Sequence, residues 1–442
     1  MPNLQRAKDH LSQAVTFLTI SHYDLTDMDL DSFTAFEHFL TEAYPLVHQH
    51  LTKTVVNSHG LVFYWPGASD NPHQPYLLTA HYDVVPVLEE GWPQPPFSGY
   101  QDQDRIWGRG TLDDKGSLIA ILESVETLLA EGFQPARDVY LAFGFDEECN
   151  GYKGAGQIAS YFKEQKIHFA CVLDEGGAVS EGSSLGISRP VAVIGLAEKG
   201  NSSFRFRFKG DEGHSATPPA HTALGKMAAF IHDVENQPLP YRLTPLLEQM
   251  LKTIAPEMPG LAGFAASHPQ AFAPLLKKIL AKNPQTQAML RTTVAFTMAD
   301  CGQAPNVLPL EASCVANVRI LQGDSVAKMS EWFKGLGHDF SLEVLAGENP
   351  TQAASLDGQA YQHLTSTIAQ VFPDALALPY LMTGGTDCRH YEEVAEASYR
   401  FMPAYLTGAE LKLMHGTGEF LSYDNLENML HFYESFLRQL PA

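Results

Sequence analysis

Acidic and histidine side chains stand directly after apolar runs at four places in the sequence. The runs YLLTA, DRIWGRGTL, VYLAFGF and FACVL are followed by His81-Tyr82-Asp83, Asp113-Asp114, Asp146-Glu147-Glu148 and Asp174-Glu175, respectively. A further histidine, His415, lies in LMHGTGEF near the C-terminus. Carboxylates that crowd at the ends of buried strands repel one another and lose solvation unless a cation neutralises them. The pattern therefore indicates a metal site.

Each of these clusters has a plainer interpretation when it is taken alone. The chain has 18 histidines, and a single histidine is more often a surface or hydrogen-bonded core residue than a metal ligand. An isolated acidic pair is usually a solvated turn. It is the recurrence at four strand ends that favours metal binding.

Short β-rich runs alternate with helical segments around these clusters. Strands are predicted at LVFYW, YLLTA, DVYLAFGF and FACVLD, and a helix at SLIAILESVETLLAEG with Gly132 at its end. This order is typical of an α/β domain with a mostly parallel central sheet flanked by helices. In such a sheet ligands bind beyond the carboxyl ends of the strands, so the four clusters are expected to converge.

The texture of the sequence changes near residue 200. In NSSFRFRFKG phenylalanines alternate with basic residues, which predicts a strand with one buried face. A Pro- and Leu-rich helical region runs from about Pro238 to Leu290 and precedes two strands, TTVAFTMA and ASCVANVRI. We therefore predict an inserted α+β domain, and the expected boundaries are 1–196 and 349–442 for the catalytic domain and 197–348 for the insert.

Bulk composition narrows the class of function. The 442 residues carry 29 Lys and Arg against 51 Asp and Glu, a formal charge of −22, with no local basic patch, so nucleic acid is not expected as a partner. The five cysteines show no CxxC spacing, which argues against a thiolate zinc site or a disulfide framework. The N-terminus has no secretion signal, and no apolar stretch reaches the roughly 18 residues of a membrane span. These features predict a cytoplasmic protein that does not bind membranes.

The order of short motifs along the chain adds a resemblance to a known family. HxD, GRGxxDDKG, DEE, LDEG, GHS, NVxP, GGTDxRH and MHGxxE follow one another between about Phe36 and Phe432. Together they resemble the two-zinc exopeptidases of the carboxypeptidase S, glutamate carboxypeptidase, aminoacylase and succinyl-diaminopimelate desuccinylase type. HYDVVPV, the long insert after GHS and TGGTDCRHY resemble the carboxypeptidase S branch most.

The resemblance implies a dinuclear centre with two Zn²⁺ ions per chain. Asp113 would bridge the two ions, and the peptide bond after it would be cis. His81 and Asp174 would complete the coordination of one metal ion, and Glu148 and His415 that of the other. Co²⁺ and Mn²⁺ suit the same imidazole and carboxylate ligands.

Further roles follow from the same resemblance. Glu147 would be the general base and acid, and Asp83 would orient the imidazole of His81. His214, in EGHSATPP, would stabilise the oxyanion of the tetrahedral intermediate. Candidates for binding the substrate, and above all its carboxylate, are Arg319, Asn306, Gly384, Gly385 and Thr386.

Two positions depart from the family pattern. Cys149 follows the glutamate pair where a small or aliphatic residue is commoner, and Gly418 stands in HGTGE where asparagine is expected. Neither is a proposed ligand. These departures affect what the resemblance implies about the preferred substrate and about the residues that support His415. They do not affect the predicted metal ligands.

The function implied by the resemblance is hydrolysis of an amide or peptide bond next to a free carboxylate. The substrate would be a small peptide or an N-acyl amino acid. A dipeptidase or a deacetylase of a biosynthetic intermediate is the alternative within the fold, and a non-catalytic metal-binding relative is the alternative outside it. The presence of Glu147 and of every ligand argues against the last.

The inserted domain is expected to act as a lid, because His214 and Arg319 lie in it while the proposed metal ligands lie outside it. In relatives this domain also supplies a homodimer interface. The helical region that begins near Pro238 would either enlarge that interface here or replace it within one chain.

Overall fold

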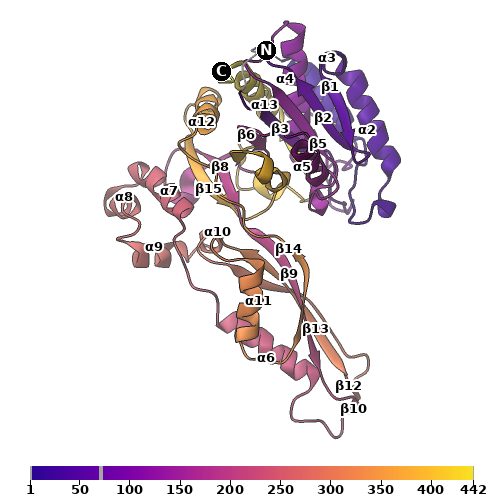
Figure 1. The fold of residues 1–442 in the computed structure, drawn as a ribbon, viewed down its shortest axis with the longest axis vertical. Coiled ribbons are helices and arrows are strands. Elements are labelled where there is room, and N and C mark those ends of the chain that lie inside the picture. Colours follow the sequence, from indigo (N-terminus) through magenta and orange to yellow (C-terminus); the bar gives the residue numbers. More distant parts are fainter. Residues whose placement is uncertain (1, 69–72, 442) are drawn as a thin grey trace. The chain divides into compact units, whose positions relative to one another are not determined.

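The computed structural model describes residues 2–68 and 73–441 and divides into two compact units (Figure 1). Unit 1 comprises Met1–Leu196, Ala354–Tyr380 and Thr386–Ala442, and unit 2 comprises Ala197–Ala353 and Leu381–Gly385. Residues 349–353 and 381–385, which were predicted to lie in the catalytic domain, belong to unit 2.

The largest sheet has a parallel centre. Its strands in spatial order are β1 (Thr52–Val56), β2 (Gly60–Trp65), β5 (Val139–Gly144), β3 (Tyr76–His81), β6 (Cys171–Asp174), β16 (Ser398–Arg400), β8 (Val191–Glu198) and β15 (Leu376–Met382), with β7 (Val179–Ser180) beside β8. β3 is parallel to β5 and β6, and β6 is parallel to β16. The β1–β2, β2–β5, β7–β8 and β8–β16 pairs are antiparallel. The predicted α/β class with a mostly parallel central sheet is confirmed.

Continuous apolar runs explain why the central strands are buried on both faces. All of β3 is buried, and its successive side chains point to opposite sides of the sheet. On one side Leu77 belongs to the same cluster as Ile158 and Phe162 of α5 (Ala155–Glu164). On the other side the ring of Tyr76 lies 6.0 Å from that of Phe436 in α13 (Tyr423–Arg438). Helices therefore cover both faces of the sheet.

The helix predicted before Gly132 is α4 (Lys115–Ala130), which packs against β3 and α13. Gly132 has a φ of 71°, a left-handed conformation that ends helices, and its N–H donates to Leu129 O. The other helices of unit 1 are α1 (Leu4–Val15), α2 (Leu30–Ala43), α3 (Pro45–His50) and α12 (Gln359–Val371), with the 3₁₀ helices η1 (Leu25–Asp27), η2 (Glu147–Cys149), η3 (Gly182–Leu185), η5 (Asp387–Val394) and η6 (Glu410–Lys412).

A small second sheet in unit 1 corrects one expectation. The apolar run before Asp113 forms β4 (Arg105–Trp107), which was expected to join the central sheet. Instead β4 pairs antiparallel with β17 (Phe420–Ser422), far along the chain. The run contains only three strand residues before the glycines of GRG. Its pairing brings the segment after Trp107 beside the segment before Phe420.

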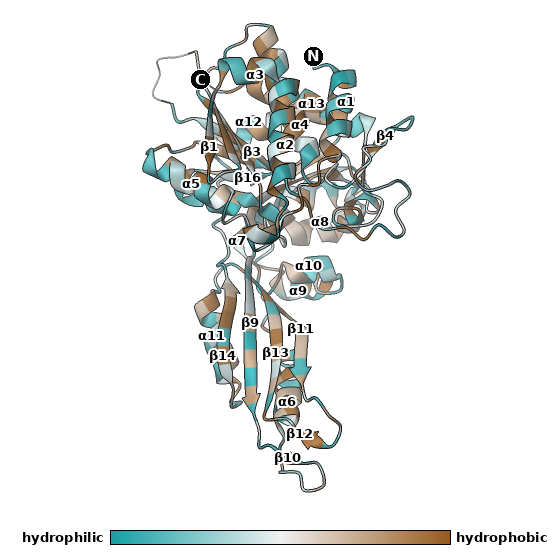
Figure 2. Cartoon of the chain, turned by 90° about the vertical axis from the view of Figure 1, so that its right-hand side faces the viewer, coloured by the Kyte–Doolittle hydropathy of each residue, from teal (hydrophilic) through white to brown (hydrophobic). Residues whose placement is uncertain are grey.

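Unit 2 contains a four-stranded antiparallel sheet with one buried face. The strand order is β11 (Thr293–Cys301), β13 (Glu311–Ile320), β9 (Gly200–Lys209) and β14 (Ser341–Gly347). Figure 2 shows the alternating hydropathy along β9. Phe204, Phe206 and Phe208 are fully buried, as the alternation predicts, whereas Arg205 and Arg207 form ion pairs with Glu343 on the other face.

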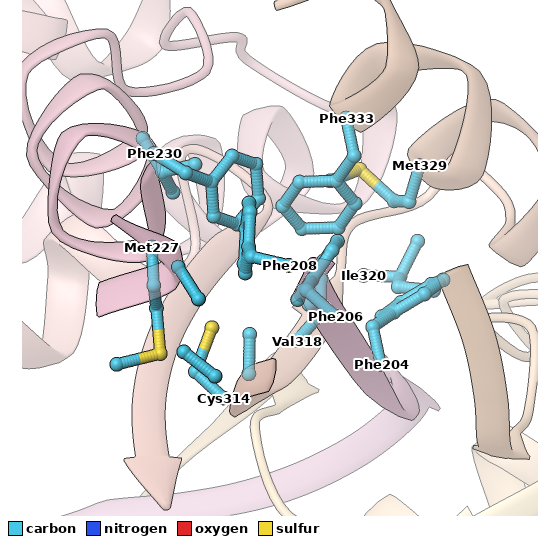
Figure 3. Packing of buried hydrophobic residues seen from close by; sticks show 14 residues of the cluster. Phe204, Phe206, Phe208, Met227, Phe230, Cys314, Val318, Ile320, Met329 and Phe333 are labelled. Atoms are coloured by element: carbon cyan, nitrogen blue, oxygen red, sulfur yellow. The ribbon is translucent and has the colours of Figure 1, made fainter. Parts of the chain in front are cut away.

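The buried face of this sheet packs against α6 (Ala223–Asn236) and α11 (Val326–Gly335). Figure 3 shows the phenylalanine rings of β9 meeting Phe230 of α6 and Phe333 of α11. The ring centroids of Phe206 lie 4.6 Å from Phe230 and 4.8 Å from Phe333. Unit 2 therefore has a hydrophobic core of its own.

The remaining elements of unit 2 are short. The predicted helical region divides into α7 (Pro245–Ile254), η4 (Ala255–Glu257), α8 (Gly260–Ser267), α9 (Ala273–Leu280) and α10 (Pro284–Ala288). A two-stranded ribbon pairs β10 (Gly213–His214) with β12 (Val307–Leu308). Within residues 2–68 and 73–441, no helix has both the length and the apolar composition that crossing a bilayer requires.

Candidate metal centre

The carboxyl edge of the large sheet collects three of the predicted clusters. His81 is the last residue of β3, and it lies in register with Gly144, the last residue of β5. The glutamates of the DEE motif follow Gly144 in η2, and Asp174 ends the neighbouring strand β6. Parallel strands present their ends at one edge, so the predicted convergence of these clusters follows from the sheet itself.

One group of side chains, here called the inner group, consists of His81, Asp113 and Glu175. His81 Nε2 lies 3.0 Å from Asp113 Oδ1 and 3.7 Å from Glu175 Oε1. One nitrogen or oxygen from each residue lies within 4.8 Å of the other two, and all three residues are buried. This is a spacing at which one cation can be held.

A second group, here called the outer group, consists of Asp113, Glu148 and His415. His415 Nε2 lies 3.0 Å from both Asp113 Oδ2 and Glu148 Oε2. Asp113 thus directs Oδ1 to the inner group and Oδ2 to the outer group. The side chain of His415 is 54% exposed, so solvent reaches this group more readily than it reaches His81. The peptide bond between Asp113 and Asp114 is cis, as predicted.

The inner group contains Glu175, and the predicted ligand Asp174 is the residue directly before it. Asp174 Oδ1 accepts a hydrogen bond from the N–H of Glu175, and Thr386 hydrogen-bonds the same carboxylate. Asp174 lies in register with Arg400 of β16, whose charge also acts on it. The charge of His81 acts on Asp174 as well, so both carboxylates lie near this imidazole, and Glu175 is the one grouped with His81 and Asp113.

The buried carboxylate of Asp83 contacts residues of both the inner and the outer group. Its Oδ1 accepts the N–H of Glu147 and its Oδ2 the N–H of Glu148, each at 3.1 Å. Asp83 Oδ1 also lies 3.2 Å from His81 Nδ1, which leaves His81 Nε2 directed at Asp113. The hydroxyl of Ser21 donates to the same carboxylate at 2.6 Å. One buried side chain therefore fixes an imidazole and the turn that carries both glutamates.

The electrostatics of the cluster fit a cation. Burial, together with the charge of Asp113, raises the pKa of Glu175 to about 8, and burial raises the pKa of Glu147 well above its usual range. Burial alone would also raise the pKa of Asp113, but its hydrogen bonds with His415 and His81 hold that pKa low. Glu175 Oε2 and Asp174 Oδ2 are buried, and neither has a hydrogen-bond partner among the described residues. A cluster of carboxylates and neutral imidazoles suits Zn²⁺, Co²⁺ or Mn²⁺.

The remaining predicted residues belong mostly to unit 2 and are described within it. His214 and Asn306 lie on adjacent segments of the β10–β12 ribbon, where the N–H of Ser215 donates to Asn306 O, and both side chains are exposed. Arg319 lies on β13, opposite Thr293 of β11. Gly384 and Gly385 are exposed. Thr386 belongs to unit 1, where it is buried and accepts the N–H of Cys388 at the start of η5.

Sequence reasoning missed two residues of this site. Glu175 was visible in the LDEG motif, but it lies beyond the last residue of β6, so the alternation along that strand could not separate it from Asp174. Glu419 closes the MHGxxE motif and is fully buried, and its carboxylate accepts the N–H groups of Leu112 and Asp113. Hydropathy periodicity is local, so it could not predict that Glu419 hydrogen-bonds a segment about three hundred positions earlier in the chain.

With this geometry established, comparison with known proteins identifies the family. Residues 77–439 match the description "Peptidase family M20/M25/M40". The chain belongs to this family.

Relatives and solved structures agree with the M20/M25/M40 assignment. "Probable carboxypeptidase S-like 2" of Dictyostelium discoideum is 36% identical over 97% of this chain and 84% of the relative. The "N-fatty-acyl-amino acid synthase/hydrolase" of Mus musculus is 34% identical over 98% of this chain and 87% of the relative. The crystal structure of an M20 family metallo-carboxypeptidase from Sulfolobus solfataricus has the same fold, with a TM-score of 0.70, 18% identity and 97% coverage of both chains. This chain is therefore a metallo-hydrolase of the M20/M25/M40 family, which confirms the resemblance drawn from its motifs.

The first prediction concerns the stability of the metal-free protein at different pH values. Burial raises the pKa of Glu175 to about 8, and hydrogen bonds with Asp113 and Glu148 raise that of His415 to about 10. A raised folded-state pKa gives stability that is complete below the unfolded value and is lost as the pH rises through the folded value. The Tm of metal-free protein should therefore fall between about pH 6.5 and pH 8, the range in which both groups lose this stability. Adding Zn²⁺ at the higher pH should restore it. A metal-free Tm that rises over this range would contradict the pKa directions.

The second prediction separates the adjacent carboxylates. Glu175→Gln and Asp174→Asn each remove one negative charge and keep the size of the side chain. After loading with Zn²⁺ and desalting, Glu175→Gln should retain about one equivalent of metal and Asp174→Asn about two, because Glu175 is the carboxylate grouped with His81 and Asp113. Elemental analysis measures this directly. The reverse result would restore Asp174 as the ligand.

Proposed function

We propose that this chain hydrolyses the amide bond of an N-acyl amino acid or small peptide next to a free carboxylate, at a dinuclear metal centre. The observation that carries the proposal is Asp113, whose two oxygens face two different ligand groups. His81 and Glu175 would complete the site on one side, and Glu148 and His415 on the other. Two divalent cations held there would lower the pKa of water and polarise the carbonyl of the substrate.

Glu147 is proposed as the general base and acid. Its Oε2 lies 4.0 Å from His81 Nε2, and Asp83 fixes its backbone N–H, so the side chain stands at the edge of the inner group. There it would take a proton from the attacking water as the C–O bond forms. The same carboxyl would then give that proton to the amide nitrogen as the C–N bond breaks. Burial raises its pKa, which favours the protonated form that this second step needs.

Unit 2 supplies the proposed contacts to the substrate. His214 would donate to the oxyanion that forms on the attacked carbonyl carbon, and Arg319 would pair with the free carboxylate through its planar guanidinium. Asn306, Gly384 and Gly385 would bind further polar groups, and Thr386 would do so from unit 1. These roles depend on the proposal that unit 2 acts as a lid and closes over unit 1 during the reaction. A homodimer formed through unit 2 is part of the same proposal.

The names of the two relatives support this substrate class. One is called carboxypeptidase S-like and the other an N-fatty-acyl-amino acid synthase/hydrolase. The products of both reactions, as named, include an amino acid or peptide with a free carboxylate. We therefore favour this class over a dipeptidase or a deacetylase of a biosynthetic intermediate.

A substrate panel tests the proposal. Zn²⁺-loaded protein is given N-acyl amino acids of short and long chain, dipeptides, and the same compounds with a C-terminal amide in place of the carboxylate. Release of free amino acid from the carboxylates should exceed release from the matched amides by at least about tenfold, because a lost charged hydrogen bond is worth about 1.5–3 kcal/mol. Equal rates on amide and carboxylate would reject the requirement for a free carboxylate.

The fourth prediction isolates Glu147. Glu147→Gln keeps the size of the side chain but cannot carry a proton, so turnover should fall by at least about a hundredfold. Its metal content should stay near that of the wild type, because Glu147 is proposed as a proton carrier and not as a ligand. Glu164→Gln, which changes an exposed glutamate of α5, is the matched control and should leave turnover unchanged. Near-normal turnover of Glu147→Gln would move the role to another group.

A further inference from the structure

We infer that Glu419, paired with Arg109, is a positioning residue that holds Asp113 and His415 at the separation the outer group needs. The inference rests on the proposed dinuclear site and deepens it. Glu419 touches neither substrate nor metal in this scheme. It would set the affinity of the outer group by joining the two chain segments that carry Asp113 and His415.

Glu419 is fully buried, and its Oε1 lies among the backbone N–H groups of the loop before α4. It accepts from Leu112 at 2.8 Å, from Gly110 at 3.1 Å and from Asp113 at 3.3 Å. The last of these is the N–H of the residue shared by both ligand groups. The position of the Asp113 backbone therefore depends on a carboxylate from the far end of the chain.

Arg109 completes the link from the other direction. It is 3% exposed, its Nη1 donates to Glu419 Oε2 at 2.5 Å, and its Nη2 donates to Gly416 O at 3.0 Å. Gly416 directly follows His415. The planar guanidinium thus pairs with Glu419 through one nitrogen and binds the His415 turn through another. A lysine has a single nitrogen and cannot reproduce this two-sided contact.

The β4–β17 ribbon brings these residues together. Trp107 of β4 pairs with Phe420 of β17, and the N–H of Gly108 donates to Glu419 O at 2.9 Å. Arg109 lies two residues after β4, and Glu419 directly precedes β17, so both lie at the same end of the ribbon. Asp113 is four residues after Arg109, and His415 is four residues before Glu419.

The His415 turn has a backbone that needs such support. His415 itself has a φ of 59°, a left-handed conformation that is uncommon outside glycine and asparagine. Gly418 has a φ of 82°, and glycine and asparagine are the residues that adopt it most readily. This explains how Gly418 can stand where the family motif has asparagine. The position requires a left-handed backbone more than a particular side chain.

Glu419→Gln is the decisive variant. Its amide oxygen can still accept the N–H groups of the Asp113 loop, but its NH₂ group would face Arg109, which has only donors. Metal-free protein is titrated with Co²⁺, and the two binding constants are read from the absorption of the bound ion. We expect one of the two sites, which we assign to the outer group, to lose about 10- to 100-fold in affinity, because residues that orient ligands contribute that much, while the other site changes little.

Glu126→Gln is the matched control. Glu126 is also a buried carboxylate of unit 1 that accepts two backbone N–H groups, those of Leu46 and Val47, but it contacts neither ligand group. A general loss of stability would lower the Tm of both variants and leave the ratio of the two Co²⁺ affinities unchanged. The ratio is therefore the readout that a purely structural role would not move.

Arg109→Lys decides the question if Glu419→Gln does not fold. It keeps a positive charge beside Glu419 and loses the planar group that reaches Gly416, so the same change in the ratio is expected. Wild-type affinities at both sites in a folded Glu419→Gln or Arg109→Lys protein would overturn the inference and leave the proposed function intact. If the wild-type protein itself takes up fewer than two Co²⁺ ions, the dinuclear site fails, and the inference falls with it.

Discussion

The burial of negative charge around Asp113 is the constraint on which the rest of this site depends. Asp113, Glu175 and Glu148 approach one another at the carboxyl edge of the sheet, and burial raises the pKa of both glutamates. Two imidazoles, those of His81 and His415, are the groups that face these oxygens directly. In the metal-free protein, hydrogen bonds with Asp113 raise the pKa of His81 against the effect of burial, and hydrogen bonds with Asp113 and Glu148 raise that of His415, so bound protons offset part of the buried negative charge. Divalent cations would displace these protons and offset more of that charge, so the geometry favours metal binding.

The surrounding scaffold keeps this unfavourable cluster in one arrangement. Asp83 binds the N–H groups of Glu147 and Glu148 and faces His81, so one carboxylate orders residues of η2 and the last residue of β3. Asp146, the residue before Glu147, likewise orders a turn, because its carboxylate accepts the N–H groups of Lys153 and Gly154. Acidic side chains in this region therefore divide into two kinds. Some are satisfied by backbone donors and shape the turns, and others keep oxygens free of donors and face the metal positions.

How much of this could be predicted from the sequence depends on the range of the interaction. The strands β3, β5 and β6, the helix α4 and the alternating strand β9 were predictable because apolar periodicity is local. The convergence of the clusters after these strands followed from the geometry of parallel sheets. The choice between Asp174 and Glu175 was not predictable from the motif, because it depends on which way one residue at the end of β6 points. The pairing of β4 with β17 was missed for a different reason, since three strand residues carry no period and their partner lies at the other end of the chain.

The two ligand groups differ in how firmly the fold holds them. His81 ends a fully buried strand, and Glu175 directly follows another, so the inner group inherits the rigidity of the sheet. His415 lies instead on a turn with left-handed residues, and its side chain is half exposed. A site that must both retain metal and admit a substrate benefits from this asymmetry, because the deep side can stay fixed while the open side meets solvent and substrate. Asp113 belongs to both sides, and so a single carboxylate joins the fixed side of the centre to the open one.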